Sequence, residues 1–221
     1  TTARMPRIVG YNVQTAVEAH HHLIVTHEVT MLGFDRDALS VMAVAADDVM
    51  TTDRLTAIVD KGYYKGEEIV ASEDAGISVV VPKPLTSNAA ARGLFDKADF
   101  AYDAKNDVYI CPAGENLTYR FTGQQDGKAI RTYWSGACTD CVIKEKCTTS
   151  KERRVRRWVH EDVLERVQDR LDADPAQLAV RSITVEHPYG TIKSWMGATH
   201  FKMRQLKNVA TEMALHVLAY N

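Results

Sequence analysis

The sequence contains no apolar run long enough to span a lipid bilayer, and residues 1–12 contain no secretory hydrophobic segment. It also lacks an excess of positive charge, because its formal net charge is only -2. A globally basic nucleic-acid-binding protein is therefore excluded, and any surface for nucleic acid must be a local patch balanced by acids elsewhere. These absences are typical of a cytosolic protein.

An initiator methionine is absent too, since the chain opens on Thr-Thr-Ala-Arg and stops at Asn221 inside an apolar helical pattern. Both ends predict a segment cut from a larger protein. The 221 residues are 45% hydrophobic and 25% charged, which is typical of a soluble globular protein with a proper core. The length favours one ordinary domain, or one domain with a large insertion.

The first 84 residues alternate between strand and helix patterns. Two β-branched runs predict a pair of antiparallel strands, followed by a helix, a short strand, a second helix capped by Gly76, and a buried strand. In order, these segments are residues 8–17, 23–30, 37–50, 56–59, 66–75 and 77–81. Their order favours an α/β domain with a mixed sheet.

The composition of the sequence changes at about Leu85. The segment that follows is rich in turn residues and isolated aromatic residues, and it contains all four cysteines. We interpret residues 85–157 as an insertion with its own small core. It separates a first part of the domain, residues 1–84, from a helical remainder, residues 158–221. Helical spacing predicts helices over 157–171, 177–195 and 206–220, with Pro188 near a boundary or kink.

Asp60 is the first candidate for a chemical role. It ends the short strand predicted before Gly62, and the carboxyl ends of strands in an open α/β sheet face the crevice where ligands bind. The position alone favours a helix-cap or turn aspartate, so one acid after a strand is a weak signal of a chemical role.

Glu186 and Lys193 are the second candidates, seven residues apart within the helix predicted over 177–195. Two helical turns would place them on one face if Pro188 does not spoil the helix. An acid and a lysine on one face suit metal and phosphate binding, and they equally suit a solvated surface. His187 and His200 lie nearby, with a supporting or a structural role, and His20, His21 and His22 fit a solvated turn.

The four cysteines predict a metal site. Cys138 and Cys141 form a CxxC pair, Cys147 follows closely, and Cys111 precedes them in Cys-Pro-Ala-Gly. Such a set is typical of a tetrahedral structural Zn²⁺ site in a zinc-ribbon-like subdomain, and a cytosolic protein would not keep these residues as disulfides. Reduced thiols without a metal are the alternative.

Several blocks of the sequence, taken in order, resemble the DDE transposases of bacterial insertion sequences. The most distinctive are DKGYYKGEEI, which contains Asp60, and VEHPYGTIK, which contains Glu186; the cysteine cluster and EMALHVLAYN also match. The resemblance implies an RNase H-like mixed sheet flanked by helices. It also implies strand cleavage and transfer at insertion-sequence ends by two Mg²⁺ or Mn²⁺ ions bound to an Asp-Asp-Glu triad.

By this resemblance, Asp60 is the second acid of the triad, Glu186 is the third, and Lys193 contacts DNA phosphate. Arg181 lies one position from the family's upstream arginine. The basic run that follows the cysteines then predicts DNA contact, with a solvated face as the alternative. Its arginines are Arg153, Arg154, Arg156 and Arg157. Expected partners are DNA ends and target DNA, with a homodimer left open, in a bacterial cytoplasm and on the nucleoid.

The first acid of the triad has no match in this sequence. In the family it precedes the two strands predicted at Ile8 and Leu23, and no Asp stands at the Thr1–Arg4 edge. Glu18 is an early acid at a strand end, and a turn role suits it better. Two readings stay open beside the active transposase: a catalytically inactive DNA-binding remnant that lacks the first Asp, and a different nuclease on the same scaffold.

Overall fold

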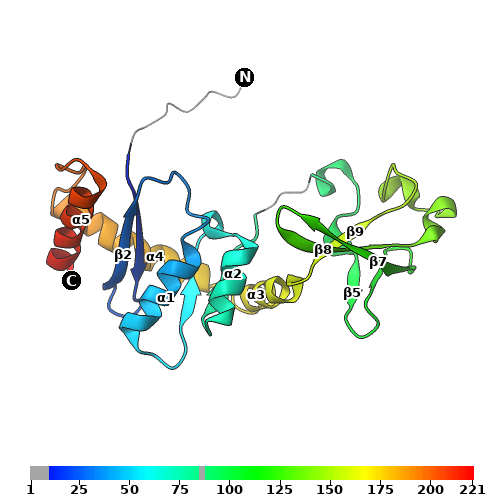
Figure 1. Cartoon of the computed structure of the whole chain (residues 1–221), viewed down its shortest axis with the longest axis horizontal. Coiled ribbons are helices and arrows are strands. Elements are labelled where there is room, and N and C mark those ends of the chain that lie inside the picture. The colour runs from blue at the N-terminus through cyan, green and yellow to red at the C-terminus, as the bar shows by residue number, and fades with distance from the viewer. Residues whose placement is uncertain (1–9, 85–87) are drawn as a thin grey trace, which may run out of the picture. The chain divides into compact units, whose positions relative to one another are not determined.

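The computed structural model describes residues 10–84 and 88–221, so the expected strand start at Ile8 and the Thr1–Arg4 edge lie outside the described residues. The chain divides into two compact units, drawn in Figure 1. Unit 1 comprises Thr1–Pro84 and Val163–Asn221, and unit 2 comprises Leu85–Asp162. The chain thus leaves unit 1, forms unit 2 and returns.

Unit 1 contains two small sheets. Strand β1 (Asn12–Val17) pairs antiparallel with β2 (Ile24–Thr30), and β3 (Thr56–Ile58) pairs parallel with β4 (Ser78–Val80). In the part of the chain that the structure describes, no strand pairs β1 with β3. The α/β class and the order of strands and helices expected from the sequence are therefore found, but the mixed sheet is divided in two.

The helices fall close to their predicted bounds, and α5 matches them fully. They are α1 (Leu39–Met50), α2 (Gly66–Asp74), α3 (Glu161–Ala173), α4 (Gln177–Gly190) and α5 (Leu206–Tyr220). The prediction was wrong at 157–158, which belong to strand β9 (Val155–Trp158). There the burial alternates, with Val155 and Arg157 inside and Arg156 outside, which is the two-residue period of a strand.

Two apolar clusters hold unit 1 together. One joins α1, α2, β4 and α3 through side chains such as Leu39, Ile69 and Val167, each at most 2% exposed. The other packs α5 on β1 and β2 through Ile24, Val209 and Met213. Burial of each such side chain contributes roughly 1.5–3 kcal/mol. The helix spacing and strand alternation place these side chains on one face of each element, and these are the faces that pack together.

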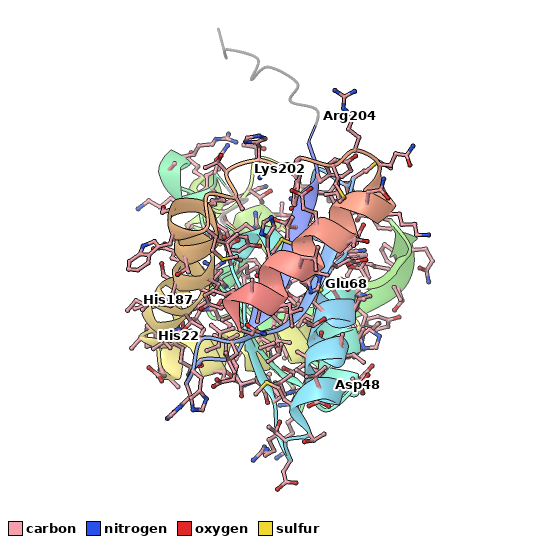
Figure 2. The ribbon with its side chains drawn as sticks, turned by 90° about the vertical axis from the view of Figure 1, so that its left-hand side faces the viewer. His22, Asp48, Glu68, His187, Lys202 and Arg204 are labelled. Atoms are coloured by element: carbon pink, nitrogen blue, oxygen red, sulfur yellow. The ribbon has the colours of Figure 1, made fainter. Side chains whose placement is uncertain are left out.

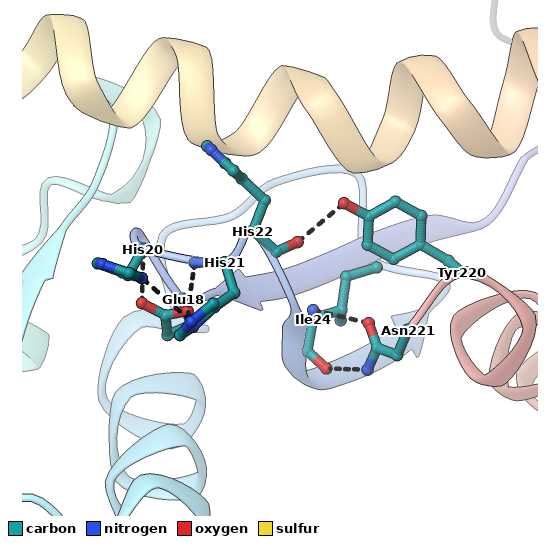
Figure 3. Close-up of polar contacts among 7 residues, drawn as sticks. All are labelled: Glu18, His20, His21, His22, Ile24, Tyr220 and Asn221. Carbon is teal, nitrogen blue, oxygen red and sulfur yellow. Dashed lines mark hydrogen bonds and ion pairs between the residues drawn. The ribbon is translucent and has the colours of Figure 1, made fainter.

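The end of α5 is fastened to the β1–β2 turn, as Figure 3 shows. The Asn221 side chain accepts from the Ile24 N–H at 3.0 Å and donates to the Ile24 carbonyl at 2.9 Å. Tyr220 donates its hydroxyl to the His22 carbonyl at 2.9 Å, and the His22 and His187 rings lie 5.2 Å apart, next to each other in Figure 2. These contacts hold the ends of α4 and α5 against the turn.

Helix α4 runs through Pro188 without breaking and then widens into a π-helical turn, Thr191–Trp195. Proline lacks the N–H that an α-helix needs at that position, and a wider turn absorbs the defect. The sequence predicted a kink or boundary near Pro188. The α-helix instead continues to Gly190, where it changes to a π-helix.

Unit 2 is an antiparallel meander in chain order. Its strands are β5 (Ala101–Asp103), β6 (Val108–Ile110), β7 (Asn116–Gln125), β8 (Lys128–Trp134) and β9. Its core is a small aromatic cluster around Tyr133, Tyr109 and Phe100. Among the described residues, no helix of either unit is long and apolar enough to cross a membrane.

Candidate functional site

Asp60 lies two residues after the end of β3, at the carboxyl end of the parallel pair. Val59 donates its N–H to Val80 at 2.9 Å, so the pairing continues up to the residue before Asp60. The Asp60 carboxylate accepts from the Gly62 N–H and caps the short 3₁₀ turn Lys61–Tyr63. Asp60 therefore caps a turn and also lies at the end of a strand, so both roles considered from the sequence are found in one residue.

A cavity of about 290 Å³ lies beside Asp60 within unit 1. Strands β1 and β3 and helices α1 and α4 all contribute to its lining, which is apolar over most of its length. Its ionisable side chains are Asp35, Asp60, Tyr63, Arg181 and Tyr189, and Thr15 and Thr56 add two hydroxyl groups. A mostly apolar cavity with a few polar groups is the usual form of a functional pocket.

Asp35 is a cavity residue that the sequence reasoning missed. It lies between β2 and α1, and its Oδ1 accepts from Asn12 Nδ2 and Gln14 Nε2, both at 2.6 Å. A Cβ added at Gly62 would lie 3.0 Å from Asp60 Oδ1 and 3.7 Å from Asp35 Oδ2, so the two carboxylates are close neighbours. The available signal was Asn12 and Gln14 at strand spacing, since a buried amide needs a partner.

Two tyrosines complete the polar end of the cavity. Tyr63 donates its hydroxyl to Gln14 Oε1, and Tyr189 donates to the Val13 carbonyl at 3.1 Å. Burial raises the pKa of both phenols above the ordinary value, and the negative charge of Asp35 adds to the effect. Both hydroxyls therefore stay protonated at neutral pH and act as hydrogen-bond donors.

Arg181 lies opposite Asp60, with 3.9 Å between Nη2 and Asp60 Oδ2. It comes from α4, and its side chain is 27% exposed while that of Asp60 is 47% exposed. The sequence left the role of Arg181 open. The structure places its guanidinium at the polar end of the cavity, beside the Asp60 carboxylate.

Glu186 and Lys193 do not line this cavity. Glu186 is exposed on α4 and accepts from Ser182 Oγ at 3.0 Å, one turn back along the helix. Val185 and Tyr189, on either side of it in sequence, face the cavity instead. Lys193 lies in the π turn with its Nζ 5.4 Å from the Tyr189 ring centre, so it does not stand two regular turns from Glu186.

The four cysteines line one small hollow of about 20 Å³ in unit 2, and all are free thiols. Cys111 and Cys147 also pack against the aromatic core. Burial raises the pKa of the Cys147 thiol, and the neighbouring cysteines reinforce this, whereas Arg153 opposes it. The residues expected to share a metal are thus gathered on one hollow.

The basic run does not present its arginines on one surface. Arg157 is only 6% exposed; its guanidinium lies 3.8 Å from the Tyr102 ring centre and donates to the Tyr109 hydroxyl at 3.3 Å. Arg153 lies over Phe100, also towards the core. Arg154 and Arg156 are exposed. The patch expected from sequence is therefore split between the two faces of the sheet.

In the described ranges, no three His, Cys, Asp or Glu side chains are arranged to hold a metal ion. The expected Asp60–Glu186 pair and Cys₄ set are thus not assembled as ligand sets.

The family model described as "Transposase DDE domain" matches residues 110–221, just over half of the chain. The match contains Glu186, Lys193 and the four cysteines and excludes Asp60. Searches of curated proteins and of solved structures gave no match.

Proposed function

This chain belongs to the transposase DDE domain family, and from that membership we propose that it cuts and joins DNA strands with divalent metal ions held at the polar end of its cavity. Family membership supports a nucleic-acid-handling enzyme with DNA as partner. The metal, the insertion-sequence ends and the strand-transfer step belong to the proposal. A magnesium-type cation suits the carboxylate oxygens of this cavity.

The observation that carries the proposal is the pairing of Asp60 with Asp35 beside one cavity. Asp35 Oδ1 is taken by two amide donors, whereas its Oδ2 faces Gly62 and Asp60. Two carboxylates brought together repel each other unless a cation lies between them, and Arg181 is in place to offset part of that repulsion. The donor set fits a hard divalent cation, with Asp60 and Asp35 as its holders.

A divalent metal pair would activate an oxygen nucleophile and stabilise the leaving oxyanion of a phosphodiester. Asp60 would hold metal, and Glu186 would complete the set as the third acid once α4 presents it to the cavity. Lys193 would bind a DNA phosphate beside the scissile bond. Tyr63 and Tyr189 would donate hydrogen bonds at the cavity and keep its amides and carboxylates in place.

The RNase H-like reading is supported by the cavity itself. Strands β1 and β3 both line it, and within the described residues each is paired with a strand on one edge alone. Unpaired strand edges readily accept another strand. A strand from outside the described residues, inserted between β1 and β3, would join the two sheets into one and bring the first acid of the triad beside Asp60.

Structural zinc in unit 2 is the second part of the proposal. The four cysteines line one hollow and are free, and a soft thiolate set of this kind prefers Zn²⁺. A bound cation would stabilise the thiolates, against the burial that now favours the neutral thiol of Cys147. The zinc would fix the 3₁₀ turn that contains Cys138 and the 3₁₀ turn that Cys147 follows.

Iron-directed cleavage tests the metal proposal without relying on activity. Fe²⁺ bound at the cavity, with ascorbate and peroxide, should cut the backbone near Asp35 and Asp60. Asp60→Asn should abolish those cuts, and Asp48→Asn, an exposed change on α1, should keep them. Cuts that persist unchanged in Asp60→Asn would overturn the metal assignment.

An inactive DNA-binding remnant is the second candidate function. It is favoured by the lack of a three-residue ligand set among the described residues. Incubation with supercoiled plasmid and Mn²⁺ separates the two: nicking that Asp60→Asn abolishes supports the enzyme, and plasmid binding without nicking supports the remnant.

A further inference from the structure

One face of the unit 2 sheet carries aromatic rings and cations side by side. The opposite face holds the core, with Leu117, Tyr133 and Val155 each at most 3% exposed. Strand side chains alternate, so the residues between these point to the other side, here called the outer face. Its rings are Phe121, Trp134 and Trp158, and its cations are Arg120, Lys128, Arg154 and Arg156.

The strand register brings these side chains together. Thr132 on β8 lies opposite both Phe121 on β7 and Arg156 on β9, which forms one row across three strands. Ile130 lies opposite Trp158 in the next row. Trp134 shares this side of β8 with Thr132 and Ile130, and its ring centre is 6.0 Å from that of Phe121.

Positive charge is interleaved with the rings. The guanidinium of Arg154 lies 4.9 Å from the Trp134 ring centre, and that of Arg120 lies 5.4 Å from it. Lys128 Nζ lies 5.0 Å from the Trp158 ring centre. Among the described residues, Glu152 accepts from Arg154 at 2.8 Å, and Glu161 accepts from the backbone N–H of Trp158 at 3.1 Å. These acids offset part of the positive charge that the four cations gather on the outer face of a chain whose net charge is -2.

We infer that the outer face binds a single DNA strand and stacks unpaired bases on Phe121 and Trp134. Phe121 is 48% exposed, so its ring is accessible to a base. Bases within a duplex already stack on each other, so exposed rings add little to duplex binding, whereas they bind unpaired bases with little sequence preference. The cations suit a phosphate backbone, and the centres of protein–protein interfaces are depleted of charge.

The inference rests on the proposed function for the identity of its ligand, since strand cleavage at DNA ends exposes single strands. It concerns a surface of unit 2 that needs neither Asp60 nor a metal. The outer face would hold a strand while duplex DNA is handled elsewhere on the protein.

Tryptophan fluorescence tests the stacking directly. The chain has three tryptophans, and Trp195→Phe leaves Trp134 and Trp158, both on the outer face, as the remaining indoles. An oligo(dT) strand should quench this variant strongly, and a duplex of equal length should quench it far less. Equal quenching by both, or none by oligo(dT), would overturn the inference.

Affinity measurements on the full chain separate stacking from charge. Phe121→Leu keeps the apolar bulk and removes the ring, and it should weaken oligo(dT) binding roughly 5- to 100-fold. Val142→Ala, a 97% exposed apolar residue in the same unit, should leave binding unchanged. Arg156→Ala should instead lower the salt slope by about 0.7. The stacking role would be overturned if Phe121→Leu and Trp134→Leu both left oligo(dT) binding intact. That result would not bear on metal-dependent cleavage at Asp60, which has a separate test.

Discussion

Arg181 Nη2 lies 3.9 Å from Asp60 Oδ2, so a fixed cation from α4 faces the carboxylate that ends β3. A metal ion bound to Asp60 would be repelled by this guanidinium. Arg181→Met should therefore strengthen Mn²⁺ binding by about 1 kcal/mol, roughly fivefold in Kd, because Asp60 is 47% exposed and water screens the pair.

The measurement is a Mn²⁺ titration followed by electron paramagnetic resonance, with Arg54→Met, an exposed arginine, as the control. Weaker Mn²⁺ binding in Arg181→Met would show that the guanidinium positions Asp60 for the metal instead of competing with it.

Gly62→Ala tests the closeness of the two carboxylates. A Cβ at this position would lie 3.0 Å from Asp60 Oδ1, tighter than ordinary contact, and 3.7 Å from Asp35 Oδ2. The Asp60 carboxylate must then shift by a few tenths of an ångström. We expect Mn²⁺ affinity to fall several-fold, with a change in unfolding free energy of about 1 kcal/mol or less.

Gly190→Ala is the matched control for that change, because a Cβ at Gly190 meets nothing within 4 Å and alanine favours a helix. It should leave Mn²⁺ affinity unchanged and stabilise the protein slightly. Unaltered Mn²⁺ affinity in Gly62→Ala would argue against metal binding between Asp35 and Asp60.

The sequence predicted those features of the site that depend on residues close together in the chain. A short apolar run before Gly62 was enough to predict Asp60 at a strand end, and the spacing of the cysteines was enough to predict that they gather in one place. Asp35 could not be found in this way, because its role depends on amides from β1 across 21 residues or more. The burial of Arg157 likewise depends on a sheet built from five strands, whereas a run of charges by itself favours a solvated surface.

The cysteine hollow gives a prediction for zinc. Freshly purified protein should contain about one Zn²⁺ per chain, and Cys138→Ser should lose it, because a tetrahedral site needs all four ligands. Asp140→Asn, an exposed change between Cys138 and Cys141, should keep the metal. Zinc released on thiol modification, followed with a colorimetric chelator, measures both.

A metal-free preparation that shows the same thermal unfolding curve as the untreated protein would count against structural zinc. Loss of metal should lower the stability of unit 2, whose core is limited to a small aromatic cluster. Trp134 fluorescence would report that loss from within the same unit.

Glu73 links three elements of unit 1, and this gives a prediction for acid stability. Its Oε1 accepts from the Val79 N–H and from Arg170 Nη1, each at 2.8 Å, which ties α2 to β4 and α3. Burial acts to raise the Glu73 pKa, but the hydrogen bonds from Arg170 and Val79 outweigh it and hold the pKa below the ordinary value. The carboxylate form therefore stabilises the fold.

This contribution is fully present above the pKa of an unfolded glutamate, about 4.3, and is lost as the pH falls through the lower pKa of the folded state. Glu73→Gln should cost roughly 1–3 kcal/mol of unfolding free energy at pH 7, and the difference from the unchanged chain should shrink below about pH 4. Asp74→Asn, which changes the exposed neighbour on α2, is the matched control. Urea unfolding at pH 7 and at pH 3.5 measures the difference, and a gap that stays constant between the two would mean that Glu73 acts through packing and not through its charge.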